Sequence, residues 1–284
     1  MRILGRPMAL RITKLFGVML VYALTVYDHG LFDSRPRGAN ITLCVPCIPA
    51  DIQSGDIFAM LDSVKKQELL PKEIILALSS ATPEYVKSVT AALSEAAFPV
   101  PLLLTAVMFP RTPGQNRNRA SELASGDIIS FFDADDLMHV SRIKVLHQAF
   151  ASQPSLQLAL HGLNNIDDLS KSQAISYHNV KKVFSETLCF MEEKTRRIGQ
   201  LWISSGILSY EITHGHSTVR REMLDYHRFF PIIVGEDCKF VRSILQEICS
   251  VEENSYKGIL LDFPFTRYVP RAIRMKAQKK IQNL

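Results

Sequence analysis

Cysteine is scarce in this sequence of 284 residues. The five cysteines are Cys44, Cys47, Cys189, Cys238 and Cys249. An odd number leaves at least one thiol without a partner in the chain, so a dense disulfide framework is excluded. Cys44 and Cys47 have the spacing of a redox pair, but they lie in and just after an expected buried strand, whereas a reactive thiolate is stabilised at a helix N-terminus. We therefore expect both side chains to serve packing.

Glycine-rich phosphate-binding loops are also missing. After the first expected strand, residues 47–55 contain one glycine and no lysine or arginine, which argues against P-loop hydrolases, nicotinamide oxidoreductases and nucleotidyltransferases.

No low-complexity tract is present, and the contents of 47% apolar and 21% charged residues are typical of a globular protein. The net charge of +5 is modest and concentrated at the chain ends, so we expect no nucleic-acid partner.

Long apolar runs are absent as well, and the uncharged run near the N-terminus is short. As a helix, Leu15–Tyr27 would be about 20 Å long, short of the roughly 30 Å of a membrane's hydrocarbon core. Its end lacks the small residues of a cleavage site. The basic residues before it are Arg2, Arg6, Arg11 and Lys14. Two hypotheses stay open: a single-pass signal anchor with the rest of the chain in the lumen, or a helix packed on the domain or lying at a membrane surface.

Apolar segments and helical patterns alternate through the first half of the chain. Four segments have the length of buried strands: 41–45, 73–78, 101–106 and 127–132. Pro46 is expected to end the first of them. Helices are expected from about Asp56, from Thr82, over 116–124, over 141–150 and over 235–248, with one more strand at 156–160. This alternation predicts an α/β fold with a mostly parallel central sheet flanked by helices.

Three aspartates, Asp133, Asp135 and Asp136, follow directly after the fourth expected strand. Ligands of parallel α/β sheets bind beyond the carboxyl ends of the strands, and Asp133 and Asp135 point to the same side of an extended tip. Clustered carboxylates repel one another unless a cation or solvent offsets their charge. We therefore predict a divalent-cation site here. The alternative is a solvated turn whose acids cap the next helix.

These residues carry a family resemblance. Asn116–Gly126, followed by Asp127–Asp136, resembles the region before and through the metal-binding aspartates of family 2 glycosyltransferases, which have the Rossmann-like GT-A fold. About a hundred residues later, Glu236-Asp237 at an expected helix start is similar to that family's acidic acceptor-site motif.

The resemblance also implies a division of the chain. Residues 39–270 would form one catalytic domain, with a nucleotide-binding half at 39–140 and an acceptor half at 141–270. Residues 1–38 would precede it as a basic and hydrophobic segment with a linker. Residues 271–284 would follow as a basic tail that rests on a membrane or partner or is solvated.

The resemblance implies roles for the acidic residues. Asp133 would hold the ribose region and, with Asp135, a Mn²⁺ or Mg²⁺ ion that bridges two phosphates, while Asp136 would support the site. Asp237 would be the catalytic base for the acceptor hydroxyl, with Glu236 as the other candidate. A single base predicts one displacement with inversion at the anomeric carbon. The alternative for Glu236 and Asp237 is stabilisation of the helix dipole.

The nucleotide site departs from the family pattern. Many members carry an acidic residue after the second strand that binds the base, and this chain has serine there. We expect Pro46 and Ser79 at the base, with Asp51 as an alternative acid. Arg117 and Arg119 would attract phosphate or form a solvated helix face. The implied donor is a nucleotide-diphospho-sugar, with a UDP-sugar favoured, and the acceptor is a glycan, a lipid or a protein.

Other polar residues fall where the family's acceptor region would be. One of His214, His216, Arg220 and Arg221 is expected to contact diphosphate or acceptor. The two histidines lack a third ligand with zinc-site spacing. Trp202 would stack on a sugar or belong to the core. The function predicted is metal-dependent sugar transfer to a hydroxyl, and the second hypothesis is a non-catalytic nucleotide-sugar-binding module.

Overall fold

The computed structural model of the chain describes residues 22–26, 39–164, 173–184, 188, 211–250 and 257–268. Trp202, the basic tail and most of the expected N-terminal helix lie outside these residues. No helix within the described ranges is long and apolar enough to span a membrane. The signal anchor therefore stays a prediction.

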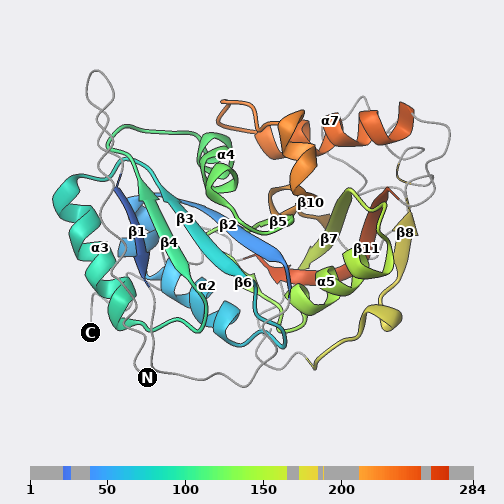
Figure 1. Cartoon of the computed structure of the whole chain (residues 1–284), viewed down its shortest axis with the longest axis horizontal. Coiled ribbons are helices and arrows are strands. Elements are labelled where there is room, and N and C mark those ends of the chain that lie inside the picture. Colours follow the sequence, from blue (N-terminus) through green and yellow to red (C-terminus); the bar gives the residue numbers. More distant parts are fainter. Residues whose placement is uncertain are drawn as a thin grey trace, which may run out of the picture.

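A parallel group of strands forms the centre of the molecule (Figure 1). These strands are β2 (Ile41–Cys47), β3 (Glu73–Leu78), β4 (Leu102–Ala106) and β5 (Ile128–Phe131). Their order across the sheet is β4-β3-β2-β5, and every neighbouring pair is parallel. The expected α/β class and its parallel centre are therefore confirmed, and the carboxyl ends of these strands open on one edge.

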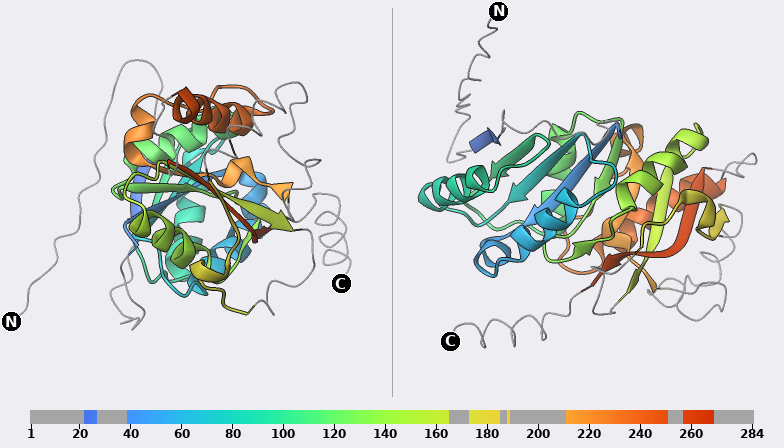
Figure 2. Two further views of the ribbon diagram at one scale, coloured as in Figure 1. Left: turned by 90° about the vertical axis from the view of Figure 1, so that its right-hand side faces the viewer. Right: turned by 90° about the horizontal axis from the view of Figure 1, so that it is seen from below.

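Helices cover both faces of this sheet (Figures 1 and 2). One face carries α2 (Asp56–Lys65), α3 (Pro83–Glu95) and α5 (Arg142–Ser152), and the other carries α4 (Pro113–Leu123) and α7 (Glu236–Ser250). Successive side chains of a strand point to opposite faces of the sheet, so each strand contributes to both layers. In β2, Leu43 and Val45 pack in the first layer and Cys44 in the second. Such burial on both faces explains why the strands read as continuous apolar runs.

The second half of the chain is built from shorter and mostly antiparallel pairings. Its strands are β6 (Leu137–Met138), β7 (Leu158–Asn164), β8 (Lys182–Phe184), β9 (Glu211–Ile212), β10 (Thr218–Arg220) and β11 (Gly258–Arg267). Short elements add α1 (Pro49–Gln53) and the 3₁₀ turns η2 (Tyr177–Asn179), η3 (His214–His216) and η4 (Arg221–Asp225). Strand β10 lies antiparallel between β5 and β7, and this pairing joins the two halves into one sheet.

The N-terminal prediction needs a correction. Tyr22–Val26, which the sequence places in a helix, forms strand β1 and pairs antiparallel with β4. The outer edge of β4 offers backbone groups that need partners, and Tyr, Thr and Val favour strands. Residues 22–26 thus extend the sheet beyond β4.

Two element boundaries also differ from expectation. Strand β2 does not end at Pro46 but runs on to Cys47, with Pro46 opposite Ala77 in β3. On the other side β5 pairs with β2 only as far as Cys44, so the proline's missing N–H interrupts no ladder. Helix α4 begins at Pro113 because Thr112 accepts a hydrogen bond from the Gln115 N–H and completes a capping box.

Candidate active site

The acidic loop lies where the sequence predicts it. Strand β5 ends at Phe131, and Asp133–Asp136 turn away from the carboxyl end of the sheet. The Asp133 side chain is 34% exposed, whereas Asp136 is buried behind it. The two carboxylates therefore face different environments although they belong to one turn.

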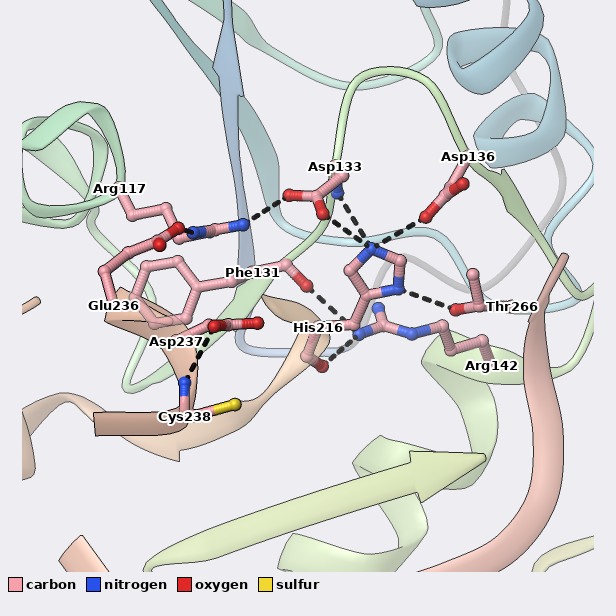
Figure 3. Close-up of polar contacts among 10 residues, drawn as sticks. All are labelled: Arg117, Phe131, Asp133, Asp136, Arg142, His216, Glu236, Asp237, Cys238 and Thr266. Carbon is pink, nitrogen blue, oxygen red and sulfur yellow. Dashed lines mark hydrogen bonds and ion pairs between the residues drawn. The ribbon is translucent and has the colours of Figure 1, made fainter. Parts of the chain in front are cut away.

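Arg117 on α4 joins this loop to a distant helix (Figure 3). Its Nη2 lies 2.5 Å from Oδ1 of Asp133, and its Nη1 lies 2.8 Å from Oε1 of Glu236 at the start of α7. The guanidinium is buried and sits 5.3 Å from the ring centre of Phe229. Burial would raise the pKa of Asp133, but Arg117 and then His216 outweigh it and hold that pKa well below its usual range. Asp133 is therefore anionic at neutral pH.

His216 is the second partner of the acidic loop. Its Nε2 lies 3.5 Å from Oδ2 of Asp133 and 3.3 Å from Oδ2 of Asp136, and its Nδ1 lies 2.8 Å from the Thr266 hydroxyl. The imidazole stacks on Phe132 with ring centres 4.3 Å apart. Burial would lower the pKa of His216, yet the two aspartates raise it above its ordinary value. Burial also raises the pKa of Asp136, which His216 only partly offsets.

The opposite wall of the site is the first turn of α7. Asp237 accepts a hydrogen bond of 2.8 Å from the Cys238 N–H (Figure 3), and its other oxygen lies toward Gly215. Burial lowers the pKa of neighbouring His214 to about 4 and raises that of the Cys238 thiol to about 12. Both neighbours are therefore neutral at pH 7, and the carboxylates of this wall are Asp237 and Glu236, the second of which is paired with Arg117.

Gly215 leaves no room for a side chain. A Cβ added there would lie 3.0 Å from Nη2 of Arg117, 3.2 Å from Oδ2 of Asp133 and 3.6 Å from Oδ2 of Asp237. The backbone of η3 thus packs directly beneath the charged groups of both walls. The glycine is needed for this close approach, not for an unusual dihedral angle.

These elements enclose a cavity of ≈ 630 Å³, a volume typical of small-molecule sites. It is lined by the end of β2, the start of α4, the acidic loop and the segment that leads into α7. Its lining includes Pro46, Asp51, Arg117, Asp133, Asp135, Glu236 and Asp237, which are residues that the sequence predicts for the site. Arg111, Asn116, Ile233 and Val234 also line it, although no prediction names them as site residues.

Some predicted residues lie elsewhere. Ser79 is fully buried, and its hydroxyl accepts a hydrogen bond of 3.0 Å from Asn116, so Asn116 rather than Ser79 faces the cavity. Arg119 pairs with Glu122 on the surface of α4. His216, expected near the acceptor, instead holds the acidic loop, because η3 folds under it.

The basic pair needs a correction too. The Arg221 guanidinium donates to the Gly126 carbonyl at the opposite end of β5 from the acidic loop, and Nε of Arg220 donates to the Leu156 carbonyl. Neither side chain lines the cavity. The antiparallel course of β10 along β5 carries both residues away from the site.

The acidic loop has the features of a divalent-cation site. Ligand atoms of Asp133, Asp136 and His216 lie within 4.8 Å of one another. One buried oxygen of Asp136, Oδ1, accepts no hydrogen bond from the part of the chain that the structure describes. A buried carboxylate oxygen of this kind needs a positive partner. Asp135, which the sequence predicts as a ligand, lines the cavity but lies outside this group of three.

Cys44 and Cys47 are free and buried, as their predicted packing role requires. Burial raises the pKa of both thiols far above the ordinary value. A neutral, inaccessible thiol is a poor nucleophile. The redox alternative is thus unsupported by their environment.

The acidic loop at the carboxyl end of the parallel sheet faces further carboxylates across one cavity, and the family match assigns this arrangement to a class, the glycosyltransferases with the GT-A fold. The chain belongs to glycosyl transferase family 2, whose family model matches residues 47–206, more than half of the sequence. No curated protein sequence matches the chain.

Solved structures share the fold. The chain matches residues 1–349 of TarS from S. aureus with a TM-score of 0.54 and 16% identity, covering 85% of this chain and 64% of that one. It matches glucosyl-3-phosphoglycerate synthase from Mycobacterium tuberculosis with a TM-score of 0.51 and 15% identity, covering 87% and 78%. The chain therefore spans less than two thirds of the TarS fragment. At such identities the likeness shows the fold alone.

Proposed function

We propose that this chain transfers a sugar from a nucleoside-diphosphate donor to an acceptor hydroxyl by one displacement with inversion, assisted by a divalent cation. The observation that carries the proposal is the double ion pair of Arg117, which holds the acidic loop and the start of α7 on one cavity. Donor and acceptor groups are thereby placed together, as transfer requires.

Asp237 is the proposed base. It lines the cavity, whereas Glu236 beside it is bound by Arg117, His214 is a weak base because burial lowers its pKa to about 4, and the Cys238 thiol already carries its proton. In the proposed step the acceptor oxygen forms a bond to the anomeric carbon, and the bond from that carbon to the diphosphate oxygen breaks. The electron pair leaves with the nucleoside diphosphate, and the hydroxyl proton passes to Asp237.

The proposed donor is a uridine-diphosphate sugar. TarS has been crystallised with UDP and with UDP-GlcNAc, and the mycobacterial synthase with UDP and Mn²⁺ or Mg²⁺. In this chain the residues available to the base and ribose are those at the end of β2, with Pro46, Asp51 and Asn116 on the cavity surface. The acceptor is a hydroxyl of a glycan, a lipid or a protein.

A cation would be held by the acidic loop. Asp133, Asp136 and His216 offer two oxygens and one nitrogen, and Asp135 is the further oxygen ligand expected from the family pattern. When bound, Mn²⁺ or Mg²⁺ supplies positive charge for the leaving diphosphate. This chain's own contribution is to fix the carboxylates: Arg117 keeps Asp133 ionised and in place.

Thermal unfolding of the full chain tests the proposal, because β1 belongs to the sheet and should not be removed. UDP, GDP, CDP, ADP and TDP are each added with Mn²⁺, Mg²⁺ or a chelator. A ligand at a hundred times its dissociation constant adds about 2.7 kcal/mol to the unfolding free energy. We expect a rise in Tm that needs both UDP and a metal. No rise with any combination would overturn the proposal.

The same measurement assigns the metal ligands. Asp135→Asn and Asp136→Asn are compared, since each removes one negative charge at nearly constant volume. Loss of the metal-dependent rise in Asp135→Asn supports the ligand pair Asp133 and Asp135. Loss only in Asp136→Asn assigns the ion to the cluster with His216, and an unchanged response in both variants places the ion elsewhere.

A further inference from the structure

Among the described residues, Arg142 is the largest side chain that is completely buried. It is the first residue of α5, just after the acidic loop, and its guanidinium turns back under that loop (Figure 3). Nη2 donates to the carbonyl of Phe131 at 3.3 Å and to the carbonyl of His216 at 3.0 Å. Nε donates to Nε2 of His161 at 2.9 Å. The side chain thus binds three separate segments.

This cation is buried without an anion. None of the described acidic residues forms an ion pair with Arg142, and Nη1 has no hydrogen-bond partner among the described residues. Burial lowers the pKa of Arg142 to about 9, so the group stays charged at pH 7. Placing an unpaired charge in the interior costs stability, and apolar residues of similar volume are often the more stable choice. Packing alone does not account for an arginine here.

His161 fixes the orientation of the guanidinium. Its Nδ1 lies 2.9 Å from the Gly162 carbonyl and must donate to it, which leaves Nε2 as an acceptor for Arg142. Burial, with Arg142 and His216 next, keeps the pKa of His161 well below its ordinary value. His161 is therefore neutral and remains an acceptor.

The two carbonyls that share Nη2 belong to the two sides of the acidic site. Phe131 lies two residues before Asp133, and His216 follows Gly215, which packs against Asp133 and Asp237. Nη2 of Arg142 bridges these two carbonyls and so ties the acidic loop to η3, in addition to the hydrogen bond from the Phe131 N–H to the Ser217 carbonyl and the contact of His216 with Asp133. Arg142 itself does not line the cavity.

We propose that Arg142 is a positioning residue that holds the acidic loop and η3 at the separation needed to bind a nucleoside diphosphate with its metal. The proposal rests on the proposed function, because it names what the spacing serves. Small displacements of binding groups can cost up to about a hundredfold in function. Replacement of Arg142 should therefore weaken ligand binding beyond its effect on stability.

Three variants of the full chain separate positioning from packing. Arg142→Met keeps the volume and removes the donors, and Arg142→Lys keeps the charge without the planar fork that reaches two carbonyls. Arg221→Met is the matched control, since it removes an arginine bound to the Gly126 carbonyl at the other end of β5. For each, Kd for UDP with Mn²⁺ is measured by calorimetry, and Tm is measured without ligand.

We expect Arg142→Met to raise Kd by about tenfold or more and Arg142→Lys to raise it several-fold, while Arg221→Met lowers Tm and leaves Kd near the wild-type value. Tm of Arg142→Met should fall, because the buried carbonyls of Phe131 and His216 and Nε2 of His161 lose their donor. If both Arg142 variants fold and bind UDP as the wild type does, the positioning role is wrong. Should Arg142→Met fail to fold, Arg142→Lys decides alone: wild-type Kd overturns the proposal. If the wild type itself binds no nucleoside diphosphate, the proposed function fails instead.

Discussion

The two halves of this chain encode structure differently. In residues 39–140, the strands of the parallel group are apolar segments of four to seven residues, and helices α3 and α4 have local start signals, Thr82 before Pro83 and Thr112 before Pro113. In the second half, β9 and β10 have two and three residues, and long-range contacts decide where they lie. The candidate site takes one wall from each half. Local sequence signals thus determine the structure of the donor side, whereas long-range contacts determine the position of the acceptor side.

Removing the proposed base should have the largest effect, and it separates catalysis by the second half from donor binding by the first half. Asp237→Asn should lower the rate of UDP release from a UDP-sugar by about 10²–10⁴-fold, because the amide cannot accept the acceptor's proton. UDP affinity, which depends on the other half, should stay within about twofold of the wild type. Rates come from steady-state assays and affinities from calorimetry.

The control for this variant is Asp225→Asn, which makes the same change at an exposed residue of η4 and should leave the rate unaltered. A rate near wild type in Asp237→Asn would assign the base to another group. Glu236→Gln would then be tested next, although Arg117 already binds that carboxylate.

Removing the double ion pair of Arg117, which joins the two halves, should have the next largest effect, a loss of stability. Arg117→Met leaves Glu236 buried without its cation and Asp133 partly so, which should lower the unfolding free energy by about 3 kcal/mol. Arg119→Met on the same helix removes only a surface pair with Glu122 and should cost less than about 1 kcal/mol. Urea unfolding measures both variants, and equal losses would mean that the double ion pair does not join the halves.

The contact of His139 with β11 also links the two halves, and its contribution to the unfolding free energy should depend on pH. Burial lowers the pKa of His139 to about 4 against the partial opposition of Glu68, and the ring packs edge-on against Phe263 and Phe265 of β11. Since the unfolded-state pKa is about 6.5, the unfolded chain binds more protons between pH 4 and 6.5. The unfolding free energy should therefore fall as the pH drops through this window and be fully retained above it.

His139→Asn tests this contribution, because the amide oxygen can replace Nδ1 as acceptor for the Ser141 N–H and does not titrate. The variant should be less stable at pH 7 but show a shallower loss between pH 6.5 and 4. The difference in slope can reach at most about 1.4 kcal/mol per pH unit. Identical slopes for variant and wild type would show that His139 does not titrate with folding.

The sequence predicts the donor side well because its signals are local. An apolar strand followed by Asp133, Asp135 and Asp136 is enough to place an acidic loop at a sheet edge. The base candidates were predicted from a family motif. The partners of these residues were not, since Arg117 and Glu236 are 119 positions apart and no pattern in either segment names the other.

Chain direction misled the prediction for the second half. The sequence predicts that one of His214, His216, Arg220 and Arg221 contacts diphosphate or acceptor, whereas η3 turns His216 under the acidic loop and β10 carries Arg221 along β5. Residues close in sequence separate here because a strand spans the distance between them. The fully buried Arg142 gave no signal either, since arginine at a helix start usually indicates solvent.

Gly215 sets a limit on how this enzyme can diversify. A Cβ at this position would lie 3.0 Å from Nη2 of Arg117 and 3.2 Å from Oδ2 of Asp133, so a side chain here requires those charged groups to shift. New substrate preferences have to arise at the rim, where Ile233 and Val234 are 80% and 84% exposed beside the cavity. Residues at the base of the cavity therefore tolerate little substitution, whereas residues at its rim can change during evolution or be changed by engineering.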